Sequence, residues 1–553
     1  MPSNRRQFLS STAGTVFGAP LGYAMAKAGE ASANLVPEPS QSGTDTAATN
    51  TAGKGQDPSR RLDTALYFDV EDVFSPPELG NDDSIKELAT ILTEEGLRGN
   101  FLFIGDRALL LKKRGRKDVI DSMGPHEVGL HTRSARHPEV PEYVAGKSWE
   151  DAVAECLKRE REGAEIIRDV FGKPCVSLSC HNVFTAPHQH RVAAILGLPF
   201  VYAIPAAPPL YSLSWYAGAL GFPWGSPTLD NKPILSHMEE PDEIYTTRDA
   251  LEAHLRKVDR HLDACLADGQ PYFTFFLIHP QRLRLRDFID TYWCPNGVNY
   301  PEERWGDFGR PRQYSPDEVR TRLANFRKLA RWIRNDPRLN VMTVPDLVRK
   351  YGKQPATITR TELVDAARSI TKGYEVLIHP RFSPAEILMS LAQGVAISAE
   401  RLPLPAQLPR LDVLGPTRNP IWNPELQGCS IQKLASIARQ LLDQTKATGH
   451  LPATLGDPLA RVGINHLYRA LAEAYLAADK GSLPAEVRFS RMPPWPEIAS
   501  AIGVGFMKAV EGELMDPDTE VNTLYRDGKL QTWTLKPGSA SESGSQSDSV
   551  SIR

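Results

Sequence analysis

Short apolar runs alternate with longer amphipathic stretches between residues 62 and 352. Brief apolar runs bounded by turn residues predict strands, whereas apolar residues spaced three and four apart predict helices. The expected strands are 64–69, 100–105, 126–131, 199–203, 233–237, 272–279 and 341–344, and the expected helices are 83–96, 149–171, 248–266 and 315–335. This alternation predicts an α/β fold with a parallel sheet, either a barrel or a doubly wound layer.

From about residue 360 the strand pattern fades and helices dominate. Expected helices at 385–394, 431–449 and 464–481 each lead to a Leu-Pro pair, at 408–409, 451–452 and 483–484, with unequal spacing. This weak repeat is similar to the pseudomurein-binding repeat, a cell-wall-binding module, although an ordinary helical domain whose helices end at Gly and Pro is the alternative. We expect a mainly helical domain over 360–537, for which cell-wall binding is one open role.

The N-terminus carries an export pattern. Two adjacent arginines, Arg5 and Arg6, precede Phe8-Leu9 and a short apolar stretch with small-residue cleavage candidates, which resembles a twin-arginine signal. We therefore expect a signal peptide over 1–28, a disordered linker rich in Ser, Thr, Ala, Gly and Pro over 29–60, and a disordered tail over 538–553. The mature protein is then expected in the periplasm or outside the cell.

Composition narrows the class of protein further. A net charge of −3 over 553 residues, with no basic face, argues against a nucleic-acid partner. No run approaches the roughly 18 apolar residues that a stable membrane span requires. The six cysteines form no CxxC pair, so neither a zinc ribbon nor a thioredoxin-like motif is supported.

Three carboxylates, Asp69, Glu71 and Asp72, end the first expected strand. Repulsion and desolvation disfavour this crowding unless a cation or a chemical role compensates. Side chains alternate along a strand, so Asp69 and Glu71 point to the same side, and one can hold a metal while the other acts as a base. Active sites of parallel barrels lie at these strand ends. An acidic turn exposed to solvent is the alternative.

Three of the thirteen histidines, His126, His131 and His137, lie within twelve residues, in and just after the third expected strand. Imidazoles with one carboxylate make a three-ligand site that leaves a coordination position open, as catalytic zinc requires. The cluster therefore predicts a metal site.

The order of 69–72, 99–105 and 126–134 resembles the polysaccharide deacetylase family (NodB-like, carbohydrate esterase) over residues 61–352. The resemblance implies an irregular (β/α) barrel of about seven strands, followed here by the helical domain. It also implies one divalent metal, most often zinc, held by a carboxylate and two histidines.

Carried over position by position, the resemblance makes Asp69 the catalytic base and Glu71 the metal carboxylate, with Asp72 as a possible substitute or outer contact. His131 matches the first metal histidine. His279 ends a late apolar strand and matches the histidine that acts as general acid, although a structural histidine at a strand end is the alternative.

The second metal histidine departs from the family pattern. It normally follows the first by four residues, but Ala135 stands there and the next histidine is His137. Either His137 still binds from a loop two residues longer, or another histidine completes the site.

The family's Arg-x-Pro motif, which steadies the base, is also missing, and residues 179–184 fill its place. His181 in that segment could bind the metal or hydrogen-bond Asp69. His188 and His190 follow closely, where the sequence favours a helix start in solvent.

Trp293 and Trp305 lie in a long aromatic and polar loop after His279 and could stack on sugar rings; a loop packed over the barrel mouth is the alternative. The resulting hypothesis is an exported, metal-dependent hydrolase that removes acetyl groups from an N- or O-acetylated polysaccharide or cell-wall glycan. A related hydrolase of another C–N or ester bond, and a non-catalytic carbohydrate-binding protein, are the alternatives that metal occupancy and substrate trials would separate.

Overall fold

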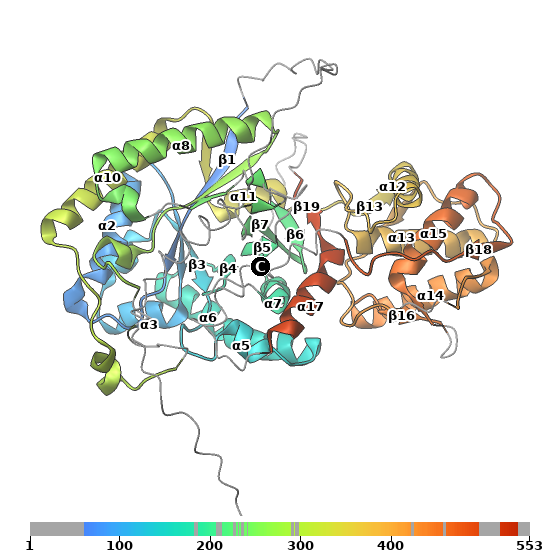
Figure 1. Ribbon diagram of the computed structural model, residues 1–553, viewed down its shortest axis with the longest axis horizontal. Helices are drawn as coiled ribbons and strands as arrows, with labels where there is room; N and C mark the ends of the chain where they lie inside the picture. The colour runs from blue at the N-terminus through green and yellow to red at the C-terminus, as the bar shows by residue number, and fades with distance from the viewer. Residues whose placement is uncertain are drawn as a thin grey trace, which may run out of the picture.

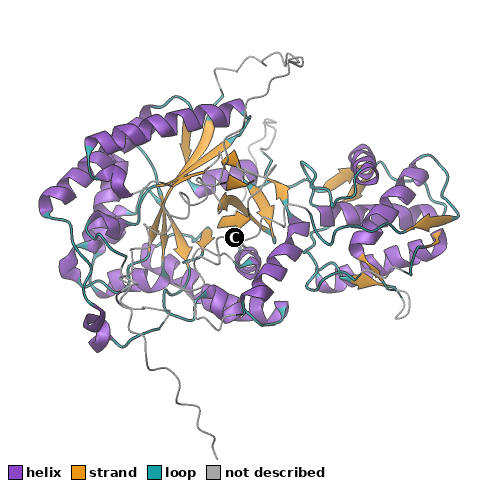
Figure 2. Cartoon of the chain, in the orientation of Figure 1, coloured by secondary structure: helices purple, strands orange, loops and turns teal. Residues whose placement is uncertain are grey.

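A computed structural model describes residues 60–181, 186–205, 213–224, 228–229, 232–233, 237–239, 242–288, 292, 298–421, 425–456, 461–496 and 520–539. The predicted signal peptide, all but the last residue of the predicted linker, and residues 540–553 lie outside this range. The described chain forms an α/β unit built on a curled parallel sheet and a smaller, mainly helical unit (Figure 1, Figure 2).

The large sheet has eleven strands in the order β10-β11-β1-β2-β3-β4-β5-β7-β6-β19, with β12 paired to β1. Its strands are β1 (Leu62–Val70), β2 (Asn100–Phe103), β3 (Glu127–His131), β4 (Ser177–Ser179), β5 (Phe200–Pro205), β6 (Ser214–Tyr216), β7 (Ala219–Trp224), β10 (His237–Glu239), β11 (Tyr272–Phe276), β12 (Leu339–Met342) and β19 (Lys536–Pro537). Only the pairs that β6 makes with β7 and β19 are antiparallel. The remaining nine described strands are parallel, so the predicted α/β fold with a parallel sheet is confirmed.

The sheet curls on itself, and its inward side chains meet across the interior. Tyr67 of β1 and Tyr202 of β5 are four strands apart in the sheet, yet their ring centroids lie 5.0 Å apart. Tyr67 also contacts Phe222 of β7 and Phe276 of β11, at 5.3 and 4.9 Å. Aromatic contacts between strands this far apart in the sheet require the barrel-like curvature that the sequence resemblance implies.

Both faces of β1 are buried, since all nine of its residues are buried. Leu66 and Phe68 face the surrounding helices, while Ala65 and Tyr67 face the aromatic interior. The alternation therefore places Asp69 on the inner side, at the end of the strand.

Helices cover the outside of the curled sheet (Figure 1). They are α2 (Asn81–Glu94), α3 (Gly105–Lys113), α4 (Lys117–Ser122), α5 (Val140–Val144), α6 (Trp149–Phe171), α7 (Pro187–Leu196), α8 (Arg248–Ala267), α10 (Pro316–Asn335) and α11 (Val344–Tyr351), with short 3₁₀ turns η1 (Pro77–Leu79), η2 (Asp242–Tyr245), η3 (Pro280–Leu283) and η5 (Glu302–Phe308). The bounds of α6 match the prediction because strong local signals set both ends: the Ser148 side chain accepts from Asp151 N, and Gly172 takes a left-handed conformation with φ 64°.

The helical unit contains two similar halves. The first holds α12 (Arg360–Lys372) and α13 (Pro384–Ala399), and β13 (Thr357–Thr359) pairs with β14 (Gln407–Pro409) to close it. The second holds α14 (Ile431–Thr448) and α15 (Ile464–Asp479), closed by β15 (Gly428–Ser430) and β18 (Glu486–Arg488). Thr359 and Ser430, which end the opening strands, also cap the helices that follow. The repeat thus runs over pairs of helices rather than single ones.

The last described segment returns to the α/β unit. Helix α17 (Val521–Gln531) packs beside α7 and α5, and β19 extends the large sheet at β6 (Figure 1). Between them lies η7 (Thr532–Thr534), whose Trp533 is fully buried in the core of the helical unit. One stretch of chain therefore holds the two units together.

Some elements were not predicted. Strands β4 and β10 are three residues long, β7 contains Gly and Pro, and the two-residue pairs β8 (Thr228–Leu229) with β9 (Lys232–Pro233) and β16 (Thr454–Leu455) with β17 (Val462–Gly463) are too short for a periodic signal. The nine parallel strands thus exceed the expected seven. No helix among the described residues is both long and apolar enough to cross a membrane.

Candidate active site

Five polar side chains converge where the parallel strands end. Asp69 is the penultimate residue of β1, Glu71 follows that strand directly, and His131 is the last residue of β3. His181 lies two residues after β4, and His279 lies three residues after β11. Parallel strands share the direction of their carboxyl ends, which is why segments far apart in the sequence meet at one edge.

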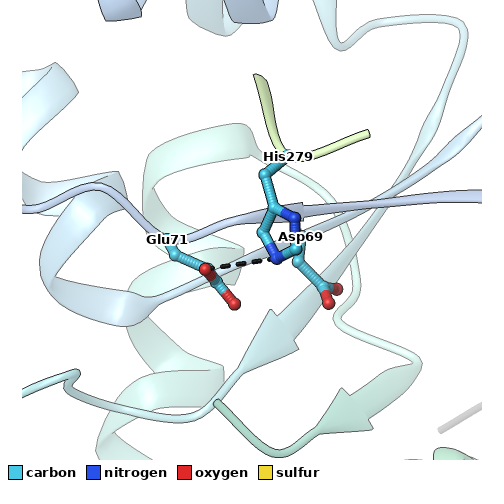
Figure 3. Close-up of side chains that lie close together, drawn as sticks. All are labelled: Asp69, Glu71 and His279. Atoms are coloured by element: carbon cyan, nitrogen blue, oxygen red, sulfur yellow. Dashed lines mark ion pairs between the residues drawn. The ribbon is translucent and has the colours of Figure 1, made fainter. Parts of the chain in front are cut away.

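Glu71 lies at the centre of this group. Its Oε1 atom is 2.9 Å from His131 Nε2. Its Oε2 atom is 3.3 Å from His279 Nε2, the ion pair drawn in Figure 3. His131 Nδ1 lies 3.8 Å from Asp69 Oδ1. One ligand atom each from Asp69, Glu71 and His279 fall within 4.8 Å of one another. The predicted base, metal carboxylate, first metal histidine and general acid therefore share one site.

Burial and charge perturb these groups strongly. Burial raises the pKa of the Asp69 carboxyl above its ordinary value, against the opposing effect of His131. Burial would also raise the pKa of Glu71, but the His279 and His181 imidazoles hold it well below its usual range. Burial acts to lower the pKa of His279, yet the Glu71 carboxylate raises it to about 9. The site thus combines a basic carboxylate with an imidazole that holds a proton.

Two buried polar atoms of the site have no hydrogen-bond partner among the described residues: Asp69 Oδ1 and His131 Nδ1. Unpaired buried polar atoms are costly, and in native proteins they point to a missing ligand, ion or water. Donors of a tetrahedral zinc site lie about 3.4 Å apart, and Glu71 Oε1 lies at a comparable 2.9 Å from His131 Nε2. A carboxylate and imidazole donor set suits a divalent metal, so these residues fit the cofactor that the sequence predicts.

Asp72 has a different role. Its Oδ1 accepts from the backbone N–H groups of Phe74 and Ser75, at 3.2 and 2.9 Å, and its Oδ2 accepts from Asn81 Nδ2. These bonds fix the turn that follows Glu71, so Asp72 acts as an outer, structural contact.

The structure pairs His137 with Glu142 and Asn299. Its Nδ1 lies 2.8 Å from Glu142 Oε2, and its backbone N–H donates to Asn299 Oδ1. Burial acts to lower the pKa of His137, but the hydrogen bond with Glu142 raises it. Its assignment as a metal ligand stays a prediction, whereas His181 Nε2 lies 4.0 Å from Glu71 Oε2.

The expected solvent exposure of His188 and His190 is wrong. Helix α7 does begin at Pro187, but both histidines are fully buried. His188 Nε2 lies 3.2 Å from Asp527 Oδ2 of α17, and its ring packs on Trp149. The sequence missed this because the covering helix comes from the other end of the chain.

Of the two tryptophans predicted to bind sugar, Trp293 lies outside the described residues. Trp305 donates from Nε1 to Tyr300 O and meets Phe74 edge-on, with ring centroids 5.3 Å apart. The Arg136 guanidinium lies 5.9 Å from the Trp305 ring and also lines a surface cleft of about 520 Å³ with Val73 and Lys113. Stacking of Trp305 on a substrate stays a prediction.

Neither a scan against protein-family models nor a search of curated proteins found a match. Solved structures do resemble this chain. A family 4 carbohydrate esterase from Streptomyces lividans in complex with acetate has a TM-score of 0.27 and 13% identity, covering 51% of this chain and 91% of that one. An allantoinase has a TM-score of 0.34 and 10% identity, covering 53% and 91%. A family 4 pseudoenzyme from Bacillus anthracis has a TM-score of 0.22 and 10% identity, covering 40% and 56%. All three TM-scores are below 0.5, so these likenesses carry no argument about activity.

Proposed function

We propose that this chain is a metal-dependent hydrolase that removes acetyl groups from an N- or O-acetylated polysaccharide or cell-wall glycan. The convergence of Asp69, Glu71, His131 and His279 at the carboxyl ends of three parallel strands carries the proposal, together with two buried polar atoms that no described residue hydrogen-bonds. Packing alone does not require four ionisable side chains around one point, because each must be desolvated there.

Glu71 and His131 would hold the cation, and zinc is the metal that a carboxylate and imidazole set favours. A bound divalent cation supplies a Lewis acid that polarises the acetyl carbonyl and acidifies water.

Asp69 and His279 would move the protons. The Asp69 carboxylate accepts a proton from the water that attacks the acetyl carbonyl, and its raised pKa makes it a stronger base. As the C–N or C–O bond breaks, the His279 imidazolium donates its proton to the departing nitrogen or oxygen. The products are acetate and a free amine or hydroxyl.

The choice of a glycan as substrate rests on the sequence resemblance. Because the Arg-x-Pro motif is missing, hydrolysis of another C–N or ester bond is the alternative. A panel that combines acetylated chitin-type, peptidoglycan and O-acetylated polysaccharides with non-sugar amides and esters would separate these substrates. Release of acetate only from the glycans supports the proposal.

Metal removal should abolish the activity. We expect about one zinc or similar ion per chain in the purified mature protein, loss of acetate release after chelation, and recovery when zinc is restored. Elemental analysis and acetate assays on the same samples provide the measurement. A protein that holds no metal after reconstitution would instead favour a non-catalytic carbohydrate-binding protein.

Export by the twin-arginine route is also part of the proposal, since a polymeric wall substrate lies outside the cytoplasm. Replacing Arg5 and Arg6 together by lysine should retain the full-length protein in the cytoplasm, as cell fractionation and immunoblotting would show. Arg60 and Arg61, another adjacent pair, provide the matched control, because their double lysine replacement should not alter export. Normal export of the Arg5/Arg6 variant would refute the route. Cell-wall binding by the helical unit remains a prediction.

A further inference from the structure

His181 belongs to the segment 179–184, which stands where the sequence resemblance expects an arginine motif. His131 of β3 is in register with Ser179 of β4, so the chain leaving β4 carries His181 alongside His131. The two rings lie 5.8 Å apart, nearly perpendicular, and His181 Nε2 is 4.0 Å from Glu71 Oε2. His181 therefore presents one ring nitrogen to the same carboxylate that His131 and His279 surround.

The other ring nitrogen of His181 meets a second carboxylate. Its Nδ1 lies 3.0 Å from Glu139 Oε1, and Glu139 is buried just before α5. When a carboxylate accepts from Nδ1–H, the lone pair of the neutral imidazole is fixed on Nε2, the tautomer that a metal needs. Metal-binding histidines in proteins are commonly oriented by this kind of pair.

The chain between His131 and Glu139 turns His137 towards a different partner. Thr132 takes a positive φ of 63°, and Asn299 holds the backbone at His137 through two hydrogen bonds. The His137 ring is then engaged by Glu142, whose carboxylate also accepts from the Glu139 N–H at the start of α5. His137 is thus paired with a carboxylate that also caps the start of α5.

We infer that His181, and not His137, completes the metal site with Glu71 and His131, and that Glu139 is the positioning residue that orients it. This inference rests on the proposed metal-dependent function. It replaces the usual second histidine, four residues after the first, with one from the next strand along the sheet.

Zinc affinity of the purified mature protein, measured by competition with a chromogenic chelator, tests the inference. We expect His181→Ala to weaken zinc binding by about 100-fold or more, and Glu139→Gln by about 10- to 100-fold. His137→Ala is the matched control and should bind zinc nearly as tightly as the unmodified protein. His181→Asn, which keeps a polar side chain, covers the case in which the alanine variant does not fold.

Cobalt substitution gives a second readout that a general loss of stability would not produce. The visible absorption of bound Co²⁺ reports its donor set, so His181→Asn and Glu139→Gln should change the spectrum, whereas His137→Ala should not. The reverse pattern would overturn the inference while leaving the proposed function intact. Failure of the unmodified protein to bind either ion would overturn both.

Discussion

Asp69→Asn should lower kcat for acetate release by about 10²- to 10⁴-fold, the usual contribution of a general base, while the protein keeps its metal. Asparagine has nearly the same shape as aspartate but cannot accept the proton from the attacking water. The geometry supports this role, because Asp69 lies on the inner face at the end of β1 and burial raises its pKa. Initial rates on an acetylated substrate, with elemental analysis of the same samples, measure both effects.

Glu71→Gln provides the matched control for Asp69→Asn, because the two carboxylates are two residues apart at the same strand end. Glu71 is the residue that His131 and His279 surround, so its neutral replacement should lose the metal as well as the activity. If Asp69→Asn lost the metal and Glu71→Gln retained it, the two roles would be exchanged. Full activity of Asp69→Asn would exclude it as the base.

Trp533→Ala should destabilise the protein by about 3–5 kcal/mol, as expected when a large aromatic side chain is removed from a core. Trp533 is fully buried, its ring meets Tyr468 edge-on, and its Nε1 donates to Pro494 O at 2.9 Å. Because this residue lies between α17 and β19, its loss should also loosen the edge of the large sheet. Urea unfolding measures the free energy, and limited proteolysis tests release of the C-terminal segment.

Tyr374→Ala is the appropriate control for Trp533→Ala. It removes an aromatic ring from the same helical unit, but Tyr374 is 67% exposed, so its replacement should cost about 0.5 kcal/mol or less. Equal effects of the two variants would show that Trp533 does not anchor the C-terminal segment.

The local sequence pattern was sufficient to predict the central strands and the long helices. Strand β1 and helix α6 carry their own signals: the apolar run 65–68 in the first, and a serine cap with a terminal glycine in the second. Asp69 and Glu71 were predicted to share a side because strand geometry fixes the direction of alternate side chains. These features depend on residues close together in the sequence.

Short or irregular elements could be identified only from the tertiary structure. Strand β4 has three residues and no periodic signal, yet its pairing with β3 places His181 next to His131. The sequence left His137 and His181 as alternatives because loop geometry, and not residue type, decides which imidazole approaches Glu71. The burial of His188 under α17 likewise depends on a contact with residue 527, near the other end of the chain.

The sequence by itself determined the α/β alternation, the helical C-terminal region and the residue types of the site, because periodicity and strand-end carboxylates and histidines are local properties. Only the tertiary structure decided that Glu139 lies 3.0 Å from His181 and that Trp533 and β19 tie the two units together. Those contacts join segments brought together by packing, and pairing between distant segments is not encoded in local pattern.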